Sequence, residues 1–345
     1  MINSRNIQRV FVAAIALSLC GCKGGGDDPI VREGVAMNTY VTISVYGSSL
    51  SPGETQGAID KAFREIDRIE QMATDYSDTS EVGRINLNAG IDSISVSHEL
   101  VELLHASLGY GVASFHAFAV TVGPIVKEWD FLSEHPGIPE RSRIDSLLPL
   151  VNDALVSIVD STVFLQRKGM ALDLGAIAKG YAVDRAIDLL KSHGVTKAIV
   201  DIGGNLGVVW EGTNMLDSTA ASIYIRHPRR EAEFFGSFLM GEGGVSTSGD
   251  YQRYFMNDGN RYHHIIDPST GYPVQGIISV TIIASDAMTA DALSTVVFVL
   301  GKDRGMEFIR NTTGAECLIV YEDRGTLVHV LSPGFKGKFI PTPTP

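Results

Sequence analysis

Residues 277–300 read IISVTIIASDAMTADALSTVVFVL. The first eight residues are largely apolar and β-branched, so they predict a buried strand over residues 277–284. The following residues predict a helix over residues 286–300. Asp291 and Thr295 stand four residues apart on this helix and therefore share one face. Oxygen ligands in that arrangement suit a hard cation such as Mg²⁺, which keeps waters and binds substrate phosphates.

The same two residues also have a plainer interpretation. An aspartate near the start of a helix is stabilised by the helix dipole. A threonine hydroxyl can hydrogen-bond to the backbone of its own helix. The spacing of Asp291 and Thr295 alone therefore leaves both a metal site and an ordinary helix terminus open.

Helical and strand patterns mix along the rest of the chain without a regular strand–helix alternation. Apolar residues at helical spacing over residues 54–73 predict an amphipathic helix, and alternation over residues 35–47 predicts a half-buried strand. A mixture of this kind favours an α+β fold over a doubly wound parallel sheet. We also expect helices over residues 97–113 and 177–192, strands over 197–202, 206–210 and 222–225, hairpins over 155–166 and 318–331, and a loop or short helical excursion over 129–149.

The chain has 345 residues and a formal net charge of −12. A chain of this length can form one large or two closely packed domains, and its acidity argues against nucleic acid as a partner. Beyond residue 22 the only cysteine is Cys317, so no disulfide can form within that part of the chain. No second apolar run there is long enough to span a bilayer.

The N-terminus is typical of a targeting segment. Arg5 and Arg9 precede an apolar run over residues 10–19 that is too short to span a bilayer. Because the run ends in LCGC, we expect a lipoprotein signal over residues 1–21, with Cys22 as the lipidated residue. An ordinary secretory signal with two incidental cysteines is the alternative. We then expect a flexible tether over residues 22–33, a folded domain over residues 34–335 and a disordered tail over residues 336–345.

Three further segments carry groups that could bind a ligand. The segment DLGAIAKGY at residues 173–181 precedes a helix, whose first amides attract anions, while free carbonyls before it could bind a cation. The paired glycines of residues 201–205 let a ligand or another backbone come close. His264 could orient a phosphate or move a proton, and Arg253 could pair with phosphate. Each also has a structural interpretation, as a helix cap, a tight turn, a packed histidine or an exposed strand residue.

Taken in order, these segments resemble the FAD:protein FMN transferase family, also called the ApbE lipoproteins. The resemblance extends from about Gly34 to Leu331, nearly the whole chain after the signal. Each piece is short, but their number and order make the match specific. The matching pieces are Met37-Asn38-Thr39, Tyr76 with Ser80-Glu81, Phe118 with residues 121–124, residues 173–181, residues 201–205, Ser248-Gly249, residues 264–273 and residues 290–295.

The resemblance implies an α+β fold of two closely packed lobes of mixed sheet and helices, with the substrate FAD between them. It implies that Mg²⁺ or Mn²⁺ lies by the pyrophosphate of FAD. A threonine hydroxyl of a partner flavoprotein, of the redox-pump type, then attacks the phosphorus on the FMN side, and AMP leaves. The product carries FMN on threonine through a phosphoester bond. The LCGC sequence at residues 19–22 resembles a bacterial lipobox. Together with the family, it implies an enzyme of the bacterial cell envelope, lipid-anchored on the extracytoplasmic side.

The resemblance also assigns roles to particular residues. Asp291 and His264 are the expected catalytic residues, with His264 as a proton acceptor or a phosphate orienter. The expected metal ligands are Asp291, Thr295 and the backbone carbonyl of Ala176. The expected FAD contacts are Met37, Tyr76, Ala117, Phe118, Ala119, Asp173, Lys179 and His264.

Two positions depart from the family pattern. Ala119 stands where the family usually has aspartate, which puts the affinity or the mode of FAD binding in question. Asn38 follows Met37 where glycine is common, which changes how closely the backbone can approach a ligand. Neither position belongs to the expected metal site.

Two other functions fit the same residues. A Mg²⁺-dependent FAD pyrophosphatase would use water as the nucleophile and release FMN and AMP. A flavin-binding lipoprotein would hold FAD without chemistry. The presence of Asp291, Thr295 and His264 weighs against the binding protein, whereas Ala119 leaves it open.

Overall fold

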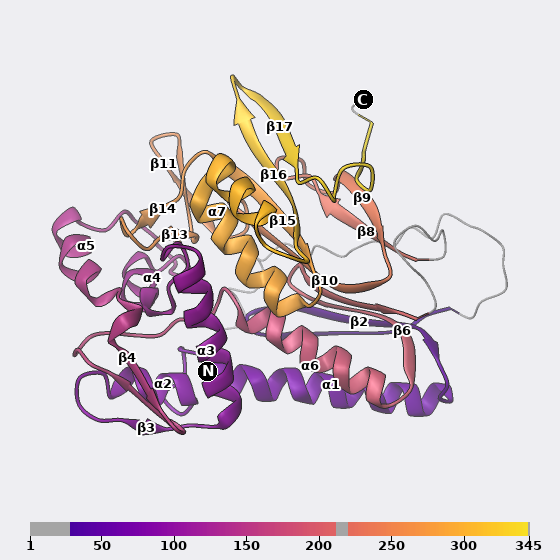
Figure 1. The fold of residues 1–345 in the computed structure, drawn as a ribbon, viewed down its shortest axis with the longest axis horizontal. Coiled ribbons are helices and arrows are strands. Elements are labelled where there is room, and N and C mark those ends of the chain that lie inside the picture. The colour runs from indigo at the N-terminus through magenta and orange to yellow at the C-terminus, as the bar shows by residue number, and fades with distance from the viewer. Residues whose placement is uncertain (1–27, 212–219, 344–345) are drawn as a thin grey trace.

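The computed structural model describes residues 28–211 and 220–343. An eight-stranded antiparallel sheet runs through the molecule in the order β1-β2-β6-β7-β10-β15-β16-β17 (Figure 1). β15 is buried along its whole length, as befits an inner strand covered on both faces. The eight strands are β1 (Ile30–Ala36), β2 (Thr39–Ser48), β6 (Val195–Ile202), β7 (Asn205–Trp210), β10 (Glu242–Gly249), β15 (Ile277–Ala284), β16 (Glu316–Asp323) and β17 (Thr326–Leu331).

Three long helices cover one face of this sheet (Figure 1). α1 (Pro52–Ala73) and α6 (Ala178–Ser192) pack against each other, and α6 lies over β6 and β7. α7 (Ala287–Arg310) lies over β10 and β15 and also packs against α6. The apolar faces of these helices and of the sheet form the main core, since burial of that surface is what stabilises the layers.

A smaller sheet covers part of the opposite face. Its strands are β8 (Ala221–Arg226), β9 (Phe234–Met240) and β18 (Ile340–Pro341), in the order β18-β9-β8. Phe238 of β9 packs edge-on against Phe335 at 5.1 Å between ring centroids, and both side chains are buried. The large sheet is therefore the middle layer between the long helices and this small sheet.

A smaller lobe lies beside the long helices, to the left in Figure 1. Tyr110 ties it to the main lobe by donating a 3.0 Å hydrogen bond to the Thr289 hydroxyl of α7. Two hairpins leave the main lobe between β10 and β15 and pack on this lobe: β11 (Tyr254–Asn257) with β12 (Asn260–His263), and β13 (Ile266–Asp267) with β14 (Tyr272–Pro273). The lobe contains α2 (Glu81–Leu87), β3 (Ile94–Ser95), α3 (His98–Ala113), α4 (Gly123–Trp129), α5 (Arg141–Leu147), β4 (Val156–Val159), β5 (Thr162–Leu165) and the 3₁₀ turns η2 (Val120–Val122), η3 (Leu148–Leu150) and η4 (Asp153–Leu155).

Local sequence signals explain most of the helix boundaries, and the helices expected over residues 54–73, 97–113 and 177–192 are confirmed. α1 begins with a capping box between Ser51 and Glu54. α3 begins after Ser97, whose hydroxyl accepts a hydrogen bond from the backbone of the first turn. The α+β fold class, the inner strands and both expected hairpins are also confirmed.

Two expected element boundaries were wrong. Residues 35–47 do not form one strand, because β1 and β2 are joined by a two-residue turn at Met37 and Asn38, with φ of 53° and 56°. Asparagine tolerates this left-handed conformation, so Asn38 can occupy a position where glycine is common. The helix expected over residues 286–300 continues to Arg310 across a kink at Gly301, where φ is 79°.

The fold extends further at both ends than the domain expected over residues 34–335. β1 begins at Ile30 and pairs with β2, so residues 30–33 belong to the fold. Phe339 is buried and β18 pairs with β9, so residues 336–341 belong to it as well. The expected signal and Cys22 lie outside the described residues. Within the described part of the chain, no helix has the length and apolar character of a membrane span.

Candidate functional site

The first turns of α6 and α7 meet in close contact, and this junction carries the expected metal residues. A Cβ on Gly180 would lie 2.2 Å from the Ala287 carbonyl oxygen and 2.7 Å from the Asp291 Cβ, so only glycine fits there. The close approach allows the Gly180 N–H to donate a 2.9 Å hydrogen bond to Asp291 Oδ2. The junction thus brings the segment of residues 173–181 against the helix that carries Asp291.

Asp184 of α6 holds the start of α7 in place. Its two carboxylate oxygens accept hydrogen bonds from the backbone N–H groups of Ala287, at 2.7 Å, and Met288, at 2.8 Å. Burial raises the pKa of Asp184 to about 7. Asp184 was not among the residues expected from the sequence. Asp184 lies four residues after Gly180 and therefore on the same face of α6. This spacing was the sequence signal that could have identified it.

Asp291 is almost fully buried, with 4% of its surface exposed. Burial raises the pKa of its carboxyl group, while the Lys179 ammonium, the Gly180 N–H and the Ser246 hydroxyl lower it. Lys179 Nζ lies 3.9 Å from Asp291 Oδ2 and donates a 2.6 Å hydrogen bond to the Gly175 carbonyl. The carboxylate therefore faces a cationic group and lies beside the loop that precedes α6.

The oxygen atoms at this junction fit a hard cation. In a regular helix the Gly180 N–H would bond to the Ala176 carbonyl, but here it points to Asp291. No described residue donates a hydrogen bond to that carbonyl. Thr295 lies one turn beyond Asp291 and is half-buried. The described residues contain no cluster of three His, Cys, Asp or Glu that could hold a metal, so a cation would need this carbonyl, hydroxyl and carboxylate set, completed by water or substrate.

Three serine hydroxyls connect α7 to the sheet beside Asp291. Ser294 Oγ donates to the Asp291 carbonyl at 2.8 Å and lies 2.8 Å from Ser248 Oγ and 3.2 Å from Ser246 Oγ. Ser246 Oγ in turn donates to Asn205 Oδ1 at 2.6 Å. The segments of Asn205, Ser248 and Ser294 were among those expected from the sequence, but Ser294 was given no role and Ser246 was not included. The alternation of Ser246 and Ser248 along β10, which places both on one face, could have revealed the pair.

His264 lies between β12 and β13, and its imidazole is neutral at physiological pH. Burial is the main cause that lowers its pKa to about 3, and the charges of Arg253, His263 and Lys179 contribute. Its backbone N–H donates to the Arg253 carbonyl at 3.0 Å. Its Nδ1 atom is buried and has no hydrogen-bond partner within the described part of the chain. A ligand group that reaches this ring nitrogen would supply the missing hydrogen-bond partner.

Lys179 connects the two sides of the site. Its ammonium lies 3.9 Å from Asp291 Oδ2 and also lowers the pKa of His264, as does Arg253. Arg253 and Asp173 both act on the phenol of Tyr76, which is 66% exposed. These expected residues therefore lie within electrostatic range of one another, and the two cations Lys179 and Arg253 suit a bound anion such as a diphosphate.

The remaining expected FAD contacts differ in how they could meet a ligand. Asp173 is half-buried, and its Oδ1 accepts a 2.7 Å hydrogen bond from the Gly175 N–H. Ala117 and Phe118 are buried, and the Phe118 ring packs in the main core against Tyr110 at 6.1 Å. The Phe118 side chain is therefore occupied by packing, which leaves the backbone of that segment for ligand contact. Met37 is half-buried at the β1–β2 turn, and Ala119 is half-buried just before η2.

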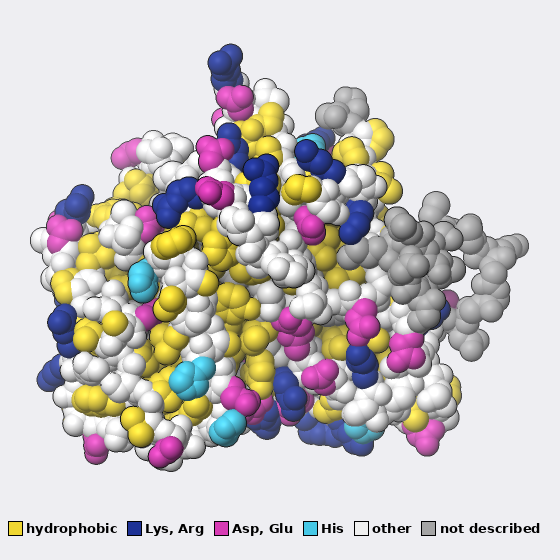
Figure 2. All heavy atoms as spheres, in the orientation of Figure 1, with side chains coloured by type: hydrophobic (Ala, Val, Ile, Leu, Met, Phe, Trp, Pro, Cys, Tyr) yellow, Lys and Arg dark blue, Asp and Glu magenta, His cyan; other side chains and the backbone are white. Residues whose placement is uncertain are grey.

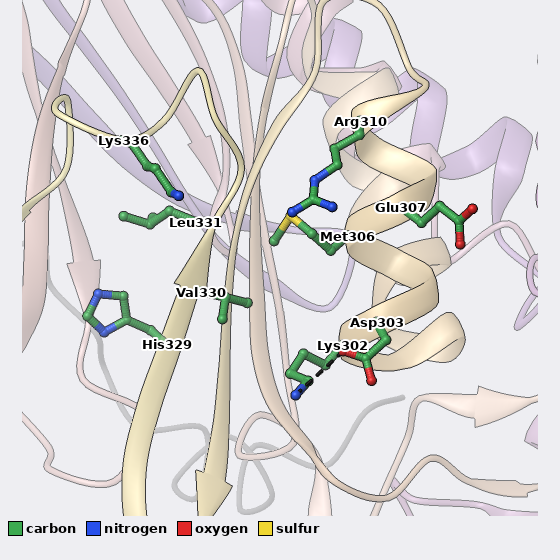
Figure 3. A pocket seen from close by; sticks show the side chains of 9 residues that line it. All are labelled: Lys302, Asp303, Met306, Glu307, Arg310, His329, Val330, Leu331 and Lys336. Carbon is green, nitrogen blue, oxygen red and sulfur yellow. Dashed lines mark ion pairs between the residues drawn. The ribbon is translucent and has the colours of Figure 1, made fainter.

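An open hollow of about 750 Å³ lies at the other end of α7 and contains none of these residues (Figure 3). Lys302, Met306 and Arg310 of α7 border it on one side, and Leu331 of β17 borders it on the other. Lys302 pairs with Asp303 at 3.5 Å. The hollow is therefore separate from the site around Asp291 and His264.

Charged side chains of both signs are interspersed on the face shown in Figure 2. The whole chain has a formal net charge of −12.

Fold and site together define the class: two-lobed α+β proteins with a buried aspartate, a lysine and a neutral histidine at the candidate site. The sequence model of the ApbE family matches residues 37–319. An FAD:protein FMN transferase of Klebsiella pneumoniae (strain 342) is 34% identical over 298 residues, which are 85% of this chain and 90% of that protein. An FAD:protein FMN transferase of Treponema pallidum (strain Nichols) is 31% identical over 331 residues, which are 91% of each chain.

Solved structures agree with these sequence matches. The crystal structure of the ApbE protein from Thermotoga maritima has a TM-score of 0.81 at 32% identity and covers 90% of this chain and 99% of its own. The flavinyl transferase ApbE of Pseudomonas stutzeri has a TM-score of 0.79 at 28% identity, with coverage of 91% and 98%. The chain belongs to the ApbE family, and it is an enzyme of the transferase class.

Proposed function

We propose that this protein transfers the FMN moiety of FAD to a threonine hydroxyl of a partner flavoprotein, with Mg²⁺ or Mn²⁺ as the metal. The observation that carries the proposal is that Lys179 Nζ lies 3.9 Å from Asp291 Oδ2 while its charge also acts on His264, which supports a common site for the three groups. A carboxylate for a metal, an ammonium group and a neutral imidazole are what displacement at a diphosphate requires. The names of the relatives support FAD as that diphosphate.

The proposed reaction is a substitution at phosphorus. The threonine oxygen forms a bond to the phosphorus on the FMN side of FAD, and the bond from that phosphorus to the bridging oxygen breaks. AMP leaves with the bridging oxygen, and the hydroxyl proton passes to a base. The flavin keeps its oxidation state, so no redox partner takes part.

The residues of the α6–α7 junction would bind the charged end of the substrate. Asp291, Thr295 and the Ala176 carbonyl would hold the metal, which when bound neutralises diphosphate charge as a Lewis acid. Lys179 donates one hydrogen bond to Gly175, and the other protons of its ammonium group are free to pair with phosphate oxygens. Arg253 would pair with the same anion from the opposite side.

His264 would contact the reacting group. Its neutral imidazole can accept a hydrogen bond, or the proton of the attacking hydroxyl, at the unpaired Nδ1. A bound diphosphate brings negative charge, which would raise the pKa of His264 from about 3 and make the imidazole a stronger base. His264 would therefore take up a proton mainly in the substrate-loaded site.

Other residues would hold the rest of FAD. Met37, Tyr76, Asp173 and the backbone of residues 117–119 are the proposed contacts. Ala119 offers no carboxylate, so we expect Ala119→Asp to tighten FAD binding, which isothermal titration with the metal-loaded protein would measure. Unchanged affinity would mean that the carboxylate common in the family has no role in this chain.

We further propose that the protein acts outside the cytoplasmic membrane, attached by a lipid on Cys22. The support is the sequence of residues 1–22, in which a charged start and an apolar run end at a cysteine. The acceptor would then be a threonine-bearing flavoprotein subunit exposed on the same side.

The test is an assay of the protein with FAD and Mg²⁺, with and without an acceptor fragment that carries the target threonine. AMP release and in-gel flavin fluorescence report cleavage and covalent transfer separately. We expect a fluorescent acceptor that survives denaturation and is absent with Asp291→Ala. An acceptor fragment with alanine in place of the threonine is the matched control.

The other outcomes point to the other functions. AMP and free FMN without a labelled acceptor would overturn the transferase in favour of a pyrophosphatase. Intact FAD in every reaction would overturn both enzymes and leave a flavin-binding lipoprotein. Transfer to the alanine fragment would overturn threonine as the acceptor residue.

A further inference from the structure

His264 is carried on a long excursion from the main sheet. β10 ends at Gly249 and β15 begins at Ile277, and the residues between them form only the short strands β11 to β14. His264 lies at a bend between two of these strands. Its position therefore depends on the contacts that hold the excursion at each end.

The main lobe holds the base of the excursion. Both oxygens of Asp250 accept hydrogen bonds from the Arg229 guanidinium, at 2.7 and 2.6 Å. His263 Nε2 lies 2.7 Å from the Val274 carbonyl, and its ring packs edge-on against Phe298 of α7 at 5.4 Å. A bidentate ion pair and buried ring packing give this end of the excursion a defined geometry.

Trp129, the last residue of α4, holds the opposite end. Its indole N–H donates a 2.8 Å hydrogen bond to the Gly271 carbonyl, and the side chain is fully enclosed, with 1% exposed. The ring stacks on Tyr262 at 5.8 Å and meets Tyr272 edge-on at 5.6 Å. Gly271 has φ of 73°, and a Cβ there would lie 2.6 Å from Ile144 Cγ2, so the smaller lobe fits tightly against this turn.

The residues around His264 are divided between the two lobes. His263 and Ile265 pack against the main lobe. Tyr262 and Ile266 pack in the aromatic cluster around Trp129. On each side of His264 in the sequence, therefore, one residue packs against the main lobe and one packs against the smaller lobe. The position of the histidine depends on both sets of contacts.

The helix of Trp129 is also tied to the other side of the site. Val120, at the start of η2 just before α4, accepts a 2.8 Å hydrogen bond from the Asp173 N–H through its carbonyl. Asp173 opens the loop that leads to Ala176 and Lys179. The segment that carries Trp129, which contacts the His264 excursion, is therefore hydrogen-bonded to the loop that forms the α6–α7 junction.

We propose that Trp129 is a positioning residue for His264, whose indole fixes the far end of the excursion so that the imidazole faces Lys179 and Asp291. The inference rests on the proposed function in one respect, because it takes His264 to be the group that contacts the reacting atoms. Trp129 acts on His264 indirectly, through its contacts with Gly271, Tyr262 and Tyr272. It is not a proposed contact of the substrate.

The first test compares Trp129→Phe with Trp210→Phe, because these are the only two tryptophans in the chain. Trp210 packs on Tyr46 at 5.0 Å at the end of β7, away from the excursion. Phenylalanine keeps an aromatic ring at residue 129 but removes the hydrogen bond to Gly271. We expect Trp129→Phe to lower kcat for FMN transfer by about 10- to 100-fold with little change in KM for FAD, as displacement of a catalytic group does. Trp210→Phe should change neither.

The second test does not depend on activity. In the wild-type protein the His264 imidazole should stay neutral well below its ordinary pKa, as followed by NMR of the ring and assigned with His264→Gln. In Trp129→Phe the ring should become more exposed and titrate at higher pH, while the charges of Arg253, His263 and Lys179 stay in place. Trp210→Phe should leave the titration unchanged.

The outcomes separate this inference from the proposed function. Equal kcat values and equal His264 titrations in the two tryptophan variants would overturn the positioning role. Absence of transfer by the wild-type protein would overturn the proposed function, while the NMR comparison would still decide the role of Trp129. If Trp129→Phe does not fold, Tyr272→Leu removes a ring at the edge of the cluster and is judged by the same two measurements.

Discussion

The two sides of the site are built in different ways. On the Asp291 side, two helix starts are held together by backbone hydrogen bonds to Asp184 and Asp291 and by the close contact at Gly180. On the His264 side, short strands and a bend are held by aromatic packing from another lobe. Both sides join segments far apart in the sequence, but the first does so through backbone N–H groups and the second through the packing of side chains. The comparison teaches that one site can combine a half held by backbone hydrogen bonds with a half held by side-chain packing.

The largest expected effect is that of Asp291→Asn. Loss of the carboxylate charge should lower FMN transfer on the order of 1,000-fold, because the metal contribution is several kcal/mol. The same change should raise the melting temperature of the metal-free protein at pH 7. The folded-state pKa of Asp291 lies above its unfolded value, so the fold disfavours the ionised form and loses stability as pH rises above about 4.

An AMP-release assay and thermal melting test the two halves of this prediction. Asp303→Asn is the matched control, since Asp303 lies on the same helix with its side chain 90% exposed. It should change neither quantity. A variant of Asp291 that loses activity and also melts at a lower temperature would show that the hydrogen bond from Gly180 outweighs the cost of burying the charge, contrary to this expectation.

His264→Gln should have the next largest effect and act on the opposite side of the site. Removal of a general base should lower kcat on the order of 100-fold. The folded-state pKa of His264 is about 3, below the unfolded value of about 6.5, so the fold favours the neutral ring. The stability that this contributes is lost as pH falls from about 6.5 towards 3.

His264→Gln should therefore reduce the loss of stability on acidification, which urea unfolding between pH 4 and pH 7 would measure. The exposed His135→Gln is the control and should unfold like the wild type at every pH. An acid sensitivity of His264→Gln as steep as that of the wild type would count against a buried neutral imidazole.

Gly180→Ala should disturb the junction itself. The added methyl group would meet the Ala287 carbonyl, so α6 and α7 must separate, at a cost of about 1–3 kcal/mol. Transfer activity should fall with stability, because Asp291 and Ala176 move apart. Gly57→Ala on α1 is the control: nothing lies within 4 Å of its added methyl group, so it should stabilise the protein by about 0.5–1 kcal/mol. A well-folded, fully active Gly180→Ala would refute the need for this close contact.

The smallest effect is expected at the β1–β2 turn. Asn38 has φ of 56°, so Asn38→Ala should cost about 1–2 kcal/mol in the free energy of unfolding, whereas Asn38→Gly should be nearly neutral. Denaturant unfolding and FAD titration of both variants measure the consequences. Tighter FAD binding by Asn38→Gly would mean that the asparagine side chain, rather than the turn geometry, limits approach of the ligand.

Some of this architecture was predictable because local interactions decide it. The strand and helix of residues 277–300 follow from apolar periodicity, and helix starts such as those of α1 and α3 follow from capping residues. The missed features have no comparable local signal. The hydrogen bonds of Asp184 to α7 join residues more than 100 positions apart, and the indole of Trp129 meets a carbonyl 142 positions away.

By itself the sequence determined the secondary structure of the long elements, the family and the chemical types of the site residues. Periodicity, capping and residue identity act over a few neighbouring positions, so they can be recognised before folding is considered. Only the tertiary structure decided that Gly180 lies against Asp291, that β18 joins the small sheet, and that His264 is half-buried, neutral and held between two lobes. Those properties depend on burial and on contacts between distant segments, and a local pattern carries no information about which distant segment supplies them.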